Sequence, residues 1–580
     1  MYLLIVDTTQ IQPFIFGGNR LRENVGASHL VASVTGEWSL QEVGNVTPRH
    51  NVADAAENKL DDTPCVESGA IAAEVIYAGG GNVAILFSDK LDAERFERVL
   101  SRRVLEYAPN LQTVIACREI DWEQESLIET FDQVFERLNI EKRSRTLSAP
   151  LHGLGVTVSC QATGLPAIGM SRVINDDPTS QYPASAEALA KLCTVSDANE
   201  RLRRMCKGAL KDGFAFPLDM DKLGRTHGEQ SQIAVVHSDG DGVGACIKKI
   251  GKKLTEKFQQ ANISSYSQLN REYVKQLREF SRAVDSSGRE ALRKVIAKLI
   301  DSVDTRDGII RHPSGKARVA PINLDLDKDD KYRLPMRPIV FGGDDVTFVC
   351  DARIGIPLAL EYMNQFAAET KEKLGEAITS CAGIAIVKTH YPFSRAYALA
   401  EDLCQSAKKY RREHKDELKD VACLDWHIAF TGLAGDVEEI RRREYTSKTN
   451  LRMTQRPVAL KQISVTDALA WEVVESALKA FQDEEWSDKR NKVKALRDAL
   501  REGENAVDKF LKMYGLTKER LPQLDSGDQL EEFRRKGWSG DVCGYFDAVE
   551  LLDLYLPLEG QGALVGGEQY GDGDTAATQE

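Results

Sequence analysis

Short apolar runs that end at glycine-rich or acidic turns recur along the first part of the chain. Four of them have the length and apolar content of buried strands: residues 3–7, 73–77, 83–87 and 113–117. A charged pattern with helical periodicity occupies residues 91–107, between the last two runs. Residues 1–120 therefore predict one small domain of sheet and helix.

The same order of elements returns in residues 231–460. Strands are expected at residues 233–237, 384–390 and 426–431, and a hairpin is expected at residues 342–345. A long charged helical insertion is expected at about 250–303. A duplicated fold is the simplest account of this recurrence.

The two copies differ where their first strands end and where their hairpins turn. Asp7 ends the first strand of one copy, and Asp239 takes that place in the other. The hairpin turns align Gly79, Gly80, Gly81 and Asn82 with Gly342, Gly343, Asp344 and Asp345. Because Gly81 and Asn82 carry no charge, we expect the first copy to be a poor metal site.

The remaining segments differ in composition. Residues 121–230 are mixed and predict a linker domain between the two copies. Residues 461–558 are rich in charged helical patterns and predict a helical C-terminal domain. The segment 559–580 is glycine-rich and carries five acidic residues and no basic one, which is typical of a disordered acidic tail.

Charge and cysteine usage narrow the class of protein. A net charge of −13 argues against a protein that coats nucleic acid non-specifically, although a local basic groove is compatible with it. The 11 cysteines include no C-x-x-C pair, which favours buried thiols in a reducing compartment over disulfides or zinc. No apolar run is long enough for a membrane span, and the N-terminus lacks the basic region of a signal peptide. We therefore expect a cytoplasmic protein without membrane contacts.

The turn at residues 342–345 carries the strongest chemical signal. Apolar runs flank it, so Asp344 and Asp345 are expected at the tip of a hairpin whose glycines let a phosphate approach the backbone. Asp239 ends another strand and can reach the same edge. Three crowded carboxylates repel one another unless cations neutralise them, and Mg²⁺ prefers carboxylate and phosphate oxygens. The pattern predicts a two-metal site for in-line displacement, and the competing interpretation is a solvated surface turn.

Basic residues have to meet the phosphates at such a site. Lys408 is the preferred contact, whereas Lys388 and Lys409 are equally compatible with solvated charge, and Arg456 is a weaker candidate. His237 lies close before Asp239 on the same strand. We expect it to be a buried histidine with satisfied hydrogen bonds rather than a metal ligand.

At these residues the sequence resembles the polymerase subunit of type III CRISPR effector complexes, a family with two palm domains. The resemblance follows the family's order through residues 7–16, 21–28, 79–82, 233–244, 342–345, 382–392, 407–408 and 454–457. It implies an α+β fold with two ferredoxin-like palm domains and a helical C-terminal domain.

The resemblance also implies roles for individual residues. Asp239, Asp344 and Asp345 would be catalytic and would bind two Mg²⁺ or Mn²⁺ ions, with ATP as the substrate. The carbonyl of Gly240 would add a ligand, and Lys408 would contact the triphosphate. The first copy, which lacks the two hairpin carboxylates, would hold a second nucleotide. The nucleotide-binding residues would be Gly240, Gly342, Gly343, Lys408, Gly79, Gly80, Gly81 and Asn82.

The implied activity is that of a nucleotidyltransferase. It would join ATP molecules into a cyclic oligoadenylate second messenger in antiviral defence and release pyrophosphate. Its partners would be small RNA-binding effector subunits with guide RNA and target RNA. Two other functions stay open: a catalytically silent nucleotide-binding scaffold in an RNA-guided complex, and a stand-alone nucleotidyl cyclase.

Three features depart from the family's pattern. The chain contains no His-Asp dipeptide, so we expect no histidine–aspartate nuclease domain and no DNA cleavage by this chain. Only Cys160 stands where many relatives carry a cysteine-rich zinc element, so we expect no zinc there. The insertion at 250–303 is long and is a candidate partner surface. These departures leave open whether the protein works inside a CRISPR complex.

Overall fold

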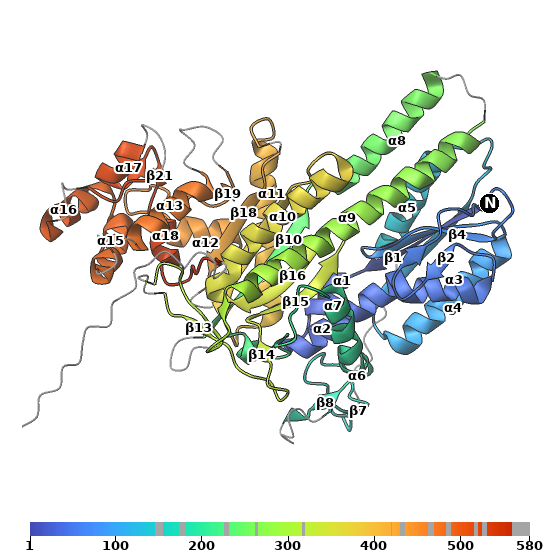
Figure 1. The fold of residues 1–580 in the computed structure, drawn as a ribbon, viewed down its shortest axis with the longest axis horizontal. Coiled ribbons are helices and arrows are strands. Elements are labelled where there is room, and N and C mark those ends of the chain that lie inside the picture. Colours follow the sequence, from blue (N-terminus) through green and yellow to red (C-terminus); the bar gives the residue numbers. More distant parts are fainter. Residues whose placement is uncertain are drawn as a thin grey trace, which may run out of the picture.

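The computed structural model describes most of the chain and shows three bodies that follow the order of the sequence (Figure 1). Residues outside the described part are 145–154, 173–179, 225–230, 261–264, 316–318, 419, 430–434, 462–468, 483–485, 487–488, 516–519, 525–529 and 560–580. The expected acidic tail falls outside the described residues, apart from Glu559. Among the described helices, none is both long and apolar enough to cross a bilayer.

The first body, which we call the first palm, is built on an antiparallel sheet in the order β4-β5-β1-β6. Its strands, with the small β2–β3 pair, are β1 (Tyr2–Thr9), β2 (Val52–Asp54), β3 (Lys59–Leu60), β4 (Ala73–Gly79), β5 (Asn82–Phe87) and β6 (Gln112–Glu119). Its helices are α1 (Ile11–Phe16), α2 (Leu21–Ser33), the π-helix η1 (Val34–Trp38), α3 (Ser39–Val46), α4 (Lys90–Tyr107) and α5 (Leu127–Ser144).

Alternation along β1 explains why helices cover both faces of this sheet. Leu4 and Val6 point to one face, where they join a core with Phe96 of α4. Leu3 and Ile5 point to the other face, where they join a core with Phe131 of α5. Because successive strand side chains point to opposite faces, an uninterrupted apolar run is the pattern expected of a strand that is buried on both sides.

A short connecting region follows and packs on α2. Its elements are β7 (Gly169–Met170), β8 (Pro183–Ala184), α6 (Ala186–Cys193), α7 (Val195–Met205), β9 (Phe214–Ala215) and η3 (Met220–Lys222). The approach is close at Gly26, where a Cβ atom would lie 1.8 Å from the carbonyl oxygen of Lys191. Gly26 is therefore required for this contact, which brings α6 and α7 beside the first palm.

The second palm is built on six described strands in the order β15-β16-β10-β17-β18-β19. These are β10 (Gln232–Gly240), β15 (Met336–Gly342), β16 (Asp345–Asp351), β17 (Ser380–Lys388), β18 (Cys423–Ile428) and β19 (Val458–Ala459). Its helices are η4 (Ala352–Ile354), α10 (Gly355–Leu374) and α11 (Phe393–Glu413). Between β10 and β15 lie α8 (Val243–Gln260), α9 (Ser267–Asp301) and the short strands β11 (Val303–Asp304), β12 (Ile309–Ile310), β13 (Ile322–Asn323) and β14 (Tyr332–Arg333).

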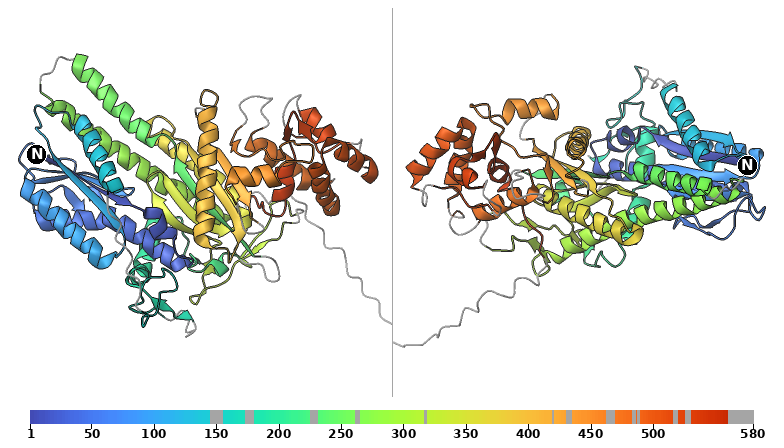
Figure 2. Two further views of the ribbon diagram at one scale, coloured as in Figure 1. Left: turned by 180° about the vertical axis from the view of Figure 1, so that it is seen from behind. Right: turned by 90° about the horizontal axis from the view of Figure 1, so that it is seen from above.

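Helix α9 is the longest of the described helices and contacts both palms (Figures 1 and 2). Its first half packs on the first palm, where Tyr273 and Leu277 share a core with Leu3. Its second half packs on the second palm, where Leu292 and Val295 join the core of that sheet. The expected helical insertion is thus confirmed as α8 and α9, and α9 joins the two sheets.

The two palms also share a hydrophobic core directly. Ile233 and Val235 of β10 belong to the same buried cluster as Leu4 of β1. Phe16 of α1 stacks on Tyr397 of α11 with ring centroids 3.7 Å apart. Burial of this apolar surface from both sides fixes the palms relative to each other.

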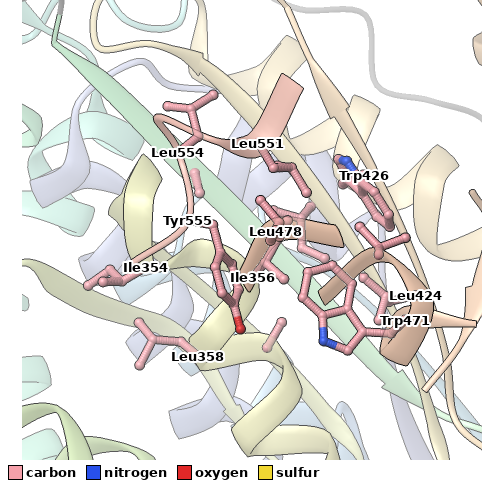
Figure 3. Close-up of a cluster of buried hydrophobic side chains, with 14 of the residues drawn as sticks. Ile354, Ile356, Leu358, Leu424, Trp426, Trp471, Leu478, Leu551, Leu554 and Tyr555 are labelled. Atoms are coloured by element: carbon pink, nitrogen blue, oxygen red, sulfur yellow. The ribbon is translucent and has the colours of Figure 1, made fainter. Parts of the chain in front are cut away.

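The C-terminal body packs against the far edge of the second palm. Its elements are α12 (Val437–Glu444), α13 (Trp471–Gln482), α15 (Arg490–Glu502), α16 (Glu504–Tyr514), α17 (Leu530–Lys536), β20 (Trp538–Ser539), β21 (Val542–Cys543) and α18 (Phe546–Leu551). Figure 3 shows the junction, where Trp426 of β18 meets Trp471 of α13 edge to face at 5.8 Å.

The α+β class with two palm sheets is confirmed, and the C-terminal part is mainly helical. The domain boundaries expected at residues 120, 230, 460 and 558 stay predictions.

Candidate active site

Three carboxylates meet at the end of the β15–β16 hairpin. β10 lies beside β16 with Ser238 opposite Val346, so the next residues, Asp239 and Asp345, come to the same edge. Oxygen atoms of Asp239, Asp344 and Asp345 all lie within 4.8 Å of one another. The structure therefore brings together the three acidic residues that the sequence singled out.

Glycines shape this edge. Gly342 and Gly343 have φ angles of 133° and 66°, which residues with a side chain rarely adopt. These two glycines form the turn that presents Asp344 and Asp345. Gly240 donates its backbone N–H to the carbonyl of Asp344 at 3.2 Å. A Cβ atom on Gly240 would lie 2.5 Å from the Cβ of Asp344. Only glycine at this position lets the hairpin tip approach β10 so closely.

Helix α9 supports the turn from the other side. The Asp285 carboxylate accepts a hydrogen bond from the backbone N–H of Gly343 at 3.1 Å. Gly288, one turn further along α9, lies so close that a Cβ atom there would be 2.3 Å from the carbonyl oxygen of Gly343. The sequence interpretation missed both residues. The available signal was a single glycine in the middle of a long helical pattern, which indicates a close packing contact.

The carboxylate cluster is short of positive charge. Lys408 of α11 donates a hydrogen bond to Asp239. Burial disfavours the charge on Lys408, but the hydrogen bond and the attraction of Asp239 together raise its pKa. Burial and the nearby Asp239 raise the pKa of Asp344 to about 6. Burial raises the pKa of Asp345 well above its usual value, and repulsion by Asp239 and Asp344 adds to this shift. One ammonium thus faces three carboxylates, and the donor set fits a hard divalent cation.

The first palm repeats the framework without the charge. Asp7 of β1 lies opposite Asn82 of β5, and the β4–β5 hairpin turns through Gly80 and Gly81. A register shift interrupts each hairpin at the equivalent place, between Val75 and Tyr77 in the first palm and between Pro338 and Val340 in the second. In the first palm Lys142 of α5 binds Asp7 at 2.5 Å, so one ammonium balances one carboxylate. The structure supports the alignment of the two copies that the sequence suggested.

Two cavities lie beside the hairpin tips. The smaller, about 270 Å³, is lined by both turns: Gly79, Gly80 and Gly81 of the first palm, and Gly342, Asp344 and Asp345 of the second. The larger, about 760 Å³, is also lined by both turns: Gly79, Gly80 and Asn82, with Gly343 and Asp344. Most of the expected nucleotide-binding residues therefore line cavities of a size suited to small molecules.

Three other residues proposed from the sequence, Gly240, Lys408 and Arg456, lie outside these cavities. Gly240 and Lys408 line neither of these two cavities, and Lys408 reaches the carboxylates from α11. Arg456 is 1% exposed and pairs with Asp547 and Glu550 in the C-terminal junction, so the suggestion that it contacts phosphate is wrong. Its long side chain bridges two bodies instead.

The two remaining basic candidates and the histidine are placed as follows. Lys409 pairs with Glu438, and Lys388 is exposed at the end of β17. His237 is buried and hydrogen-bonds to Thr347 at 3.0 Å, which confirms the expectation of a satisfied buried histidine.

Comparison with known proteins finds a family match for the segment that carries the three carboxylates. Residues 232–419, which run from β10 through α11 and into the segment after it, match the family described as Cas10/Cmr2, second palm domain. This segment is similar to that second palm domain.

Solved structures extend the likeness along the chain. A Csm1–Csm4 cassette in complex with cA4 matches with a TM-score of 0.50 at 13% identity, over 96% of this chain and 70% of that one. Two others are similar: a Csm1–Csm4 cassette with pppApApA (TM-score 0.49, 13% identity, 95% and 69% covered) and Csm1 of T. onnurineus (0.49, 14%, 96% and 70%). No curated protein matches the sequence. The chain is thus Cas10-like in fold over nearly its whole length.

Proposed function

We propose that the protein is a metal-dependent nucleotidyltransferase that joins ATP molecules into a cyclic oligonucleotide second messenger in antiviral defence. The observation that carries the proposal is the meeting of Asp239, Asp344 and Asp345 at a hairpin tip that faces the blunted hairpin of the first palm across shared cavities. The fold also supports the proposal, because the Csm1–Csm4 cassette with a similar fold was solved in complex with cA4.

The carboxylates fit the ions that such chemistry uses. Asp239, Asp344 and Asp345 would hold two Mg²⁺ or Mn²⁺ ions, which when bound neutralise charge on the attacking and leaving oxygens. The raised pKa of Asp344 agrees with this role, because a carboxylate site without its cation retains protons.

The residues of the chain supply position and charge. The glycine turns leave room for a nucleotide to approach the backbone at each hairpin. In the reaction, a 3′-hydroxyl oxygen of one nucleotide forms a bond to the α-phosphorus of another, and the bond to pyrophosphate breaks. Lys408, held at the carboxylates by Asp239, lies where it can pair with phosphate charge. Positioning and charge neutralisation provide the catalysis.

The partners would be small RNA-binding effector subunits carrying guide RNA and target RNA, as in type III CRISPR complexes. The fold match to a Csm1–Csm4 cassette supports this part of the proposal.

Pyrophosphate release from ATP tests the function. The purified protein is assayed with Mg²⁺ or Mn²⁺, alone and with RNA-loaded effector subunits, and the product is identified by mass spectrometry. We expect a cyclic oligoadenylate, lost in Asp344→Asn/Asp345→Asn. The exposed adjacent pair Asp329→Asn/Asp330→Asn is the matched control and should keep wild-type activity.

Other outcomes select the alternatives. Nucleotide binding without turnover under every condition indicates the silent scaffold. A cyclic product formed at full rate without RNA or partners indicates a stand-alone nucleotidyl cyclase.

A further inference from the structure

The smaller cavity also has a basic wall, which no part of the proposed chemistry uses. Arg201 and Arg204 of α7 and Arg289 of α9 line this cavity together with Asp344 and Asp345. Helix α7 belongs to the connecting region between the palms and reaches the cavity because α6 and α7 pack on α2.

These three arginines differ in their partners. Arg204 pairs with Glu57 at 3.0 Å, and Arg289 pairs with Asp285 at 2.9 Å. For Arg201, the described part of the chain offers neither a hydrogen bond nor an ion pair. Its guanidinium lies 4.6 Å from the ring centre of Phe341, the residue directly before the glycine turn of the second palm.

Arg201 therefore holds a positive charge that has no direct carboxylate partner among the described residues. Removal from water disfavours this charge most, and repulsion by Arg289 adds to the effect, so the pKa of Arg201 falls to about 10. Asp285 opposes the shift but already pairs with Arg289 and accepts the N–H of Gly343. Since Arg201 has no hydrogen-bond acceptor of its own among the described residues, its guanidinium N–H groups are available to an anion that enters this cavity.

We infer that Arg201 and Arg289 form a phosphate subsite for a nucleotide held between the two hairpins. The inference rests on the proposed function for the identity of the ligand as a nucleotide. A planar guanidinium can donate two parallel hydrogen bonds to a phosphate, which a lysine cannot match.

The subsite is oriented before a ligand arrives. The guanidinium of Arg201 packs on the ring of Phe341, and Asp285 holds the guanidinium of Arg289. Since Asp285 also binds Gly343, the phosphate subsite and the catalytic turn share one support. A nucleotide phosphate at this wall would sit in the same cavity as the carboxylates that act on the reacting phosphate.

Binding of ATP and of adenosine separates phosphate recognition from base recognition. The measurement uses the full chain in the Asp344→Asn/Asp345→Asn background with EDTA, so that metal ions and carboxylate repulsion do not contribute. Titration calorimetry compares this background with added Arg201→Gln, Arg201→Lys or Arg203→Gln. Arg203 is exposed on the same helix and lines neither cavity, so it is the matched control.

We expect Arg201→Gln to weaken ATP binding about 10-fold or more, because hydrogen bonds between charged groups are lost, while adenosine binding stays unchanged. Arg201→Lys should recover only part of the loss, and Arg203→Gln should behave like the background. Circular dichroism confirms that each variant is folded.

Three results would overturn the inference: ATP affinity of Arg201→Gln within about twofold of the background, an equal loss for adenosine, or no preference of the background for ATP over adenosine. These outcomes are independent of turnover. A protein that releases pyrophosphate but shows no effect of Arg201 retains the proposed function and loses this subsite. A protein that binds ATP through Arg201 but never releases pyrophosphate retains this subsite and loses the proposed function.

Discussion

Single residues distinguish the hairpin tips of the two palms. Asp344 and Asp345 stand where the first palm has Gly81 and Asn82, and the strand registers of the two hairpins agree with this alignment. Asp239 has an equivalent in Asp7, which pairs with Lys142. The difference between the palms is therefore two carboxylates on an otherwise similar frame.

Cation binding at the second palm should depend on pH. The folded-state pKa of Asp344, about 6, lies above its unfolded value. Without metal, this group therefore stabilises the fold at low pH, and that contribution is lost as the pH rises through about 6. Because cations compete with the same protons, we predict that Mn²⁺ raises the melting temperature by several degrees at pH 7.5 and by much less at pH 5.5.

Differential scanning fluorimetry at both pH values checks this prediction. Asp344→Asn/Asp345→Asn serves as the control and should respond weakly to Mn²⁺ at either pH. Equal stabilisation at both pH values would contradict the assignment of these carboxylates as ligands.

Gly240 should be intolerant of any side chain. In Gly240→Ala the new Cβ meets the side chain of Asp344 at 2.5 Å, so the hairpin tip must move. We predict a loss of turnover of about 100-fold, since displacements near 1 Å misplace reacting groups, and a destabilisation of about 1–3 kcal/mol. Gly213→Ala is the control, because Gly213 is exposed, lines neither cavity and has room for the added methyl group. Wild-type turnover in Gly240→Ala would show that the observed approach of the two strands is not needed.

At the scale of elements, helix α9 acts as a support for the β15–β16 hairpin. Asp285 binds the backbone of Gly343, and Gly288 permits contact between the helix and the turn. Neither residue has to touch substrate for this role.

Removing the support should reduce turnover more than stability. Asp285→Ala loses the hydrogen bond to Gly343 and the partly exposed ion pair with Arg289, together worth about 1–2 kcal/mol of stability, but frees the turn that carries two of the three carboxylates. We predict a drop in turnover of about 10-fold or more, measured as pyrophosphate release, with a smaller change in ATP affinity. The control is Asp301→Ala on the same helix, which loses only an exposed pair with Lys211. An Asp285→Ala enzyme with wild-type turnover would contradict the supporting role.

The sequence predicted local elements better than contacts between them. The β15–β16 hairpin was predictable because the glycine turn and the apolar flanks lie within one short segment. The contact of Asp285 with Gly343 was not, since it joins positions 58 residues apart through a helix that looks like any charged insertion. Arg201 was not predicted for the same reason, because it lies in the connecting region and its ring partner, Phe341, lies in the second palm.

At the scale of the molecule, α9 ties the two hairpins into one frame. Arg278 of α9 binds Glu74 at 2.9 Å and also donates to the carbonyls of Val75 and Ile76, where the first palm's hairpin has its register shift. Further along the same helix, Asp285 holds the second hairpin. One rigid element thus sets the spacing across which two nucleotides would meet.

Breaking this link should destabilise the whole protein. The Arg278 and Glu74 side chains are 4% and 0% exposed, so Arg278→Met removes part of the charge balance from a buried carboxylate. We predict a loss of about 3 kcal/mol, measured by chemical denaturation, with Arg271 still pairing Glu74. The control Arg282→Met loses an exposed pair with Asp62 and should cost less than about 1 kcal/mol. Equal stability of the two variants would contradict the link.

Long-range packing of this kind was beyond the sequence. Alternation predicted that each sheet is buried, but not that Ile233 of one palm would share a core with Leu4 of the other. The same pattern would suit two separate domains, and only the structure shows that they are joined.

The most direct test of the central claim is a count of Mn²⁺ ions bound beside a non-reactive ATP analogue, measured by electron paramagnetic resonance titration. We predict two ions per chain for the wild-type protein, none or one weakly bound ion for Asp344→Asn/Asp345→Asn, and two for the control Asp329→Asn/Asp330→Asn. Equal Mn²⁺ binding by all three proteins would show that these carboxylates are not the metal site.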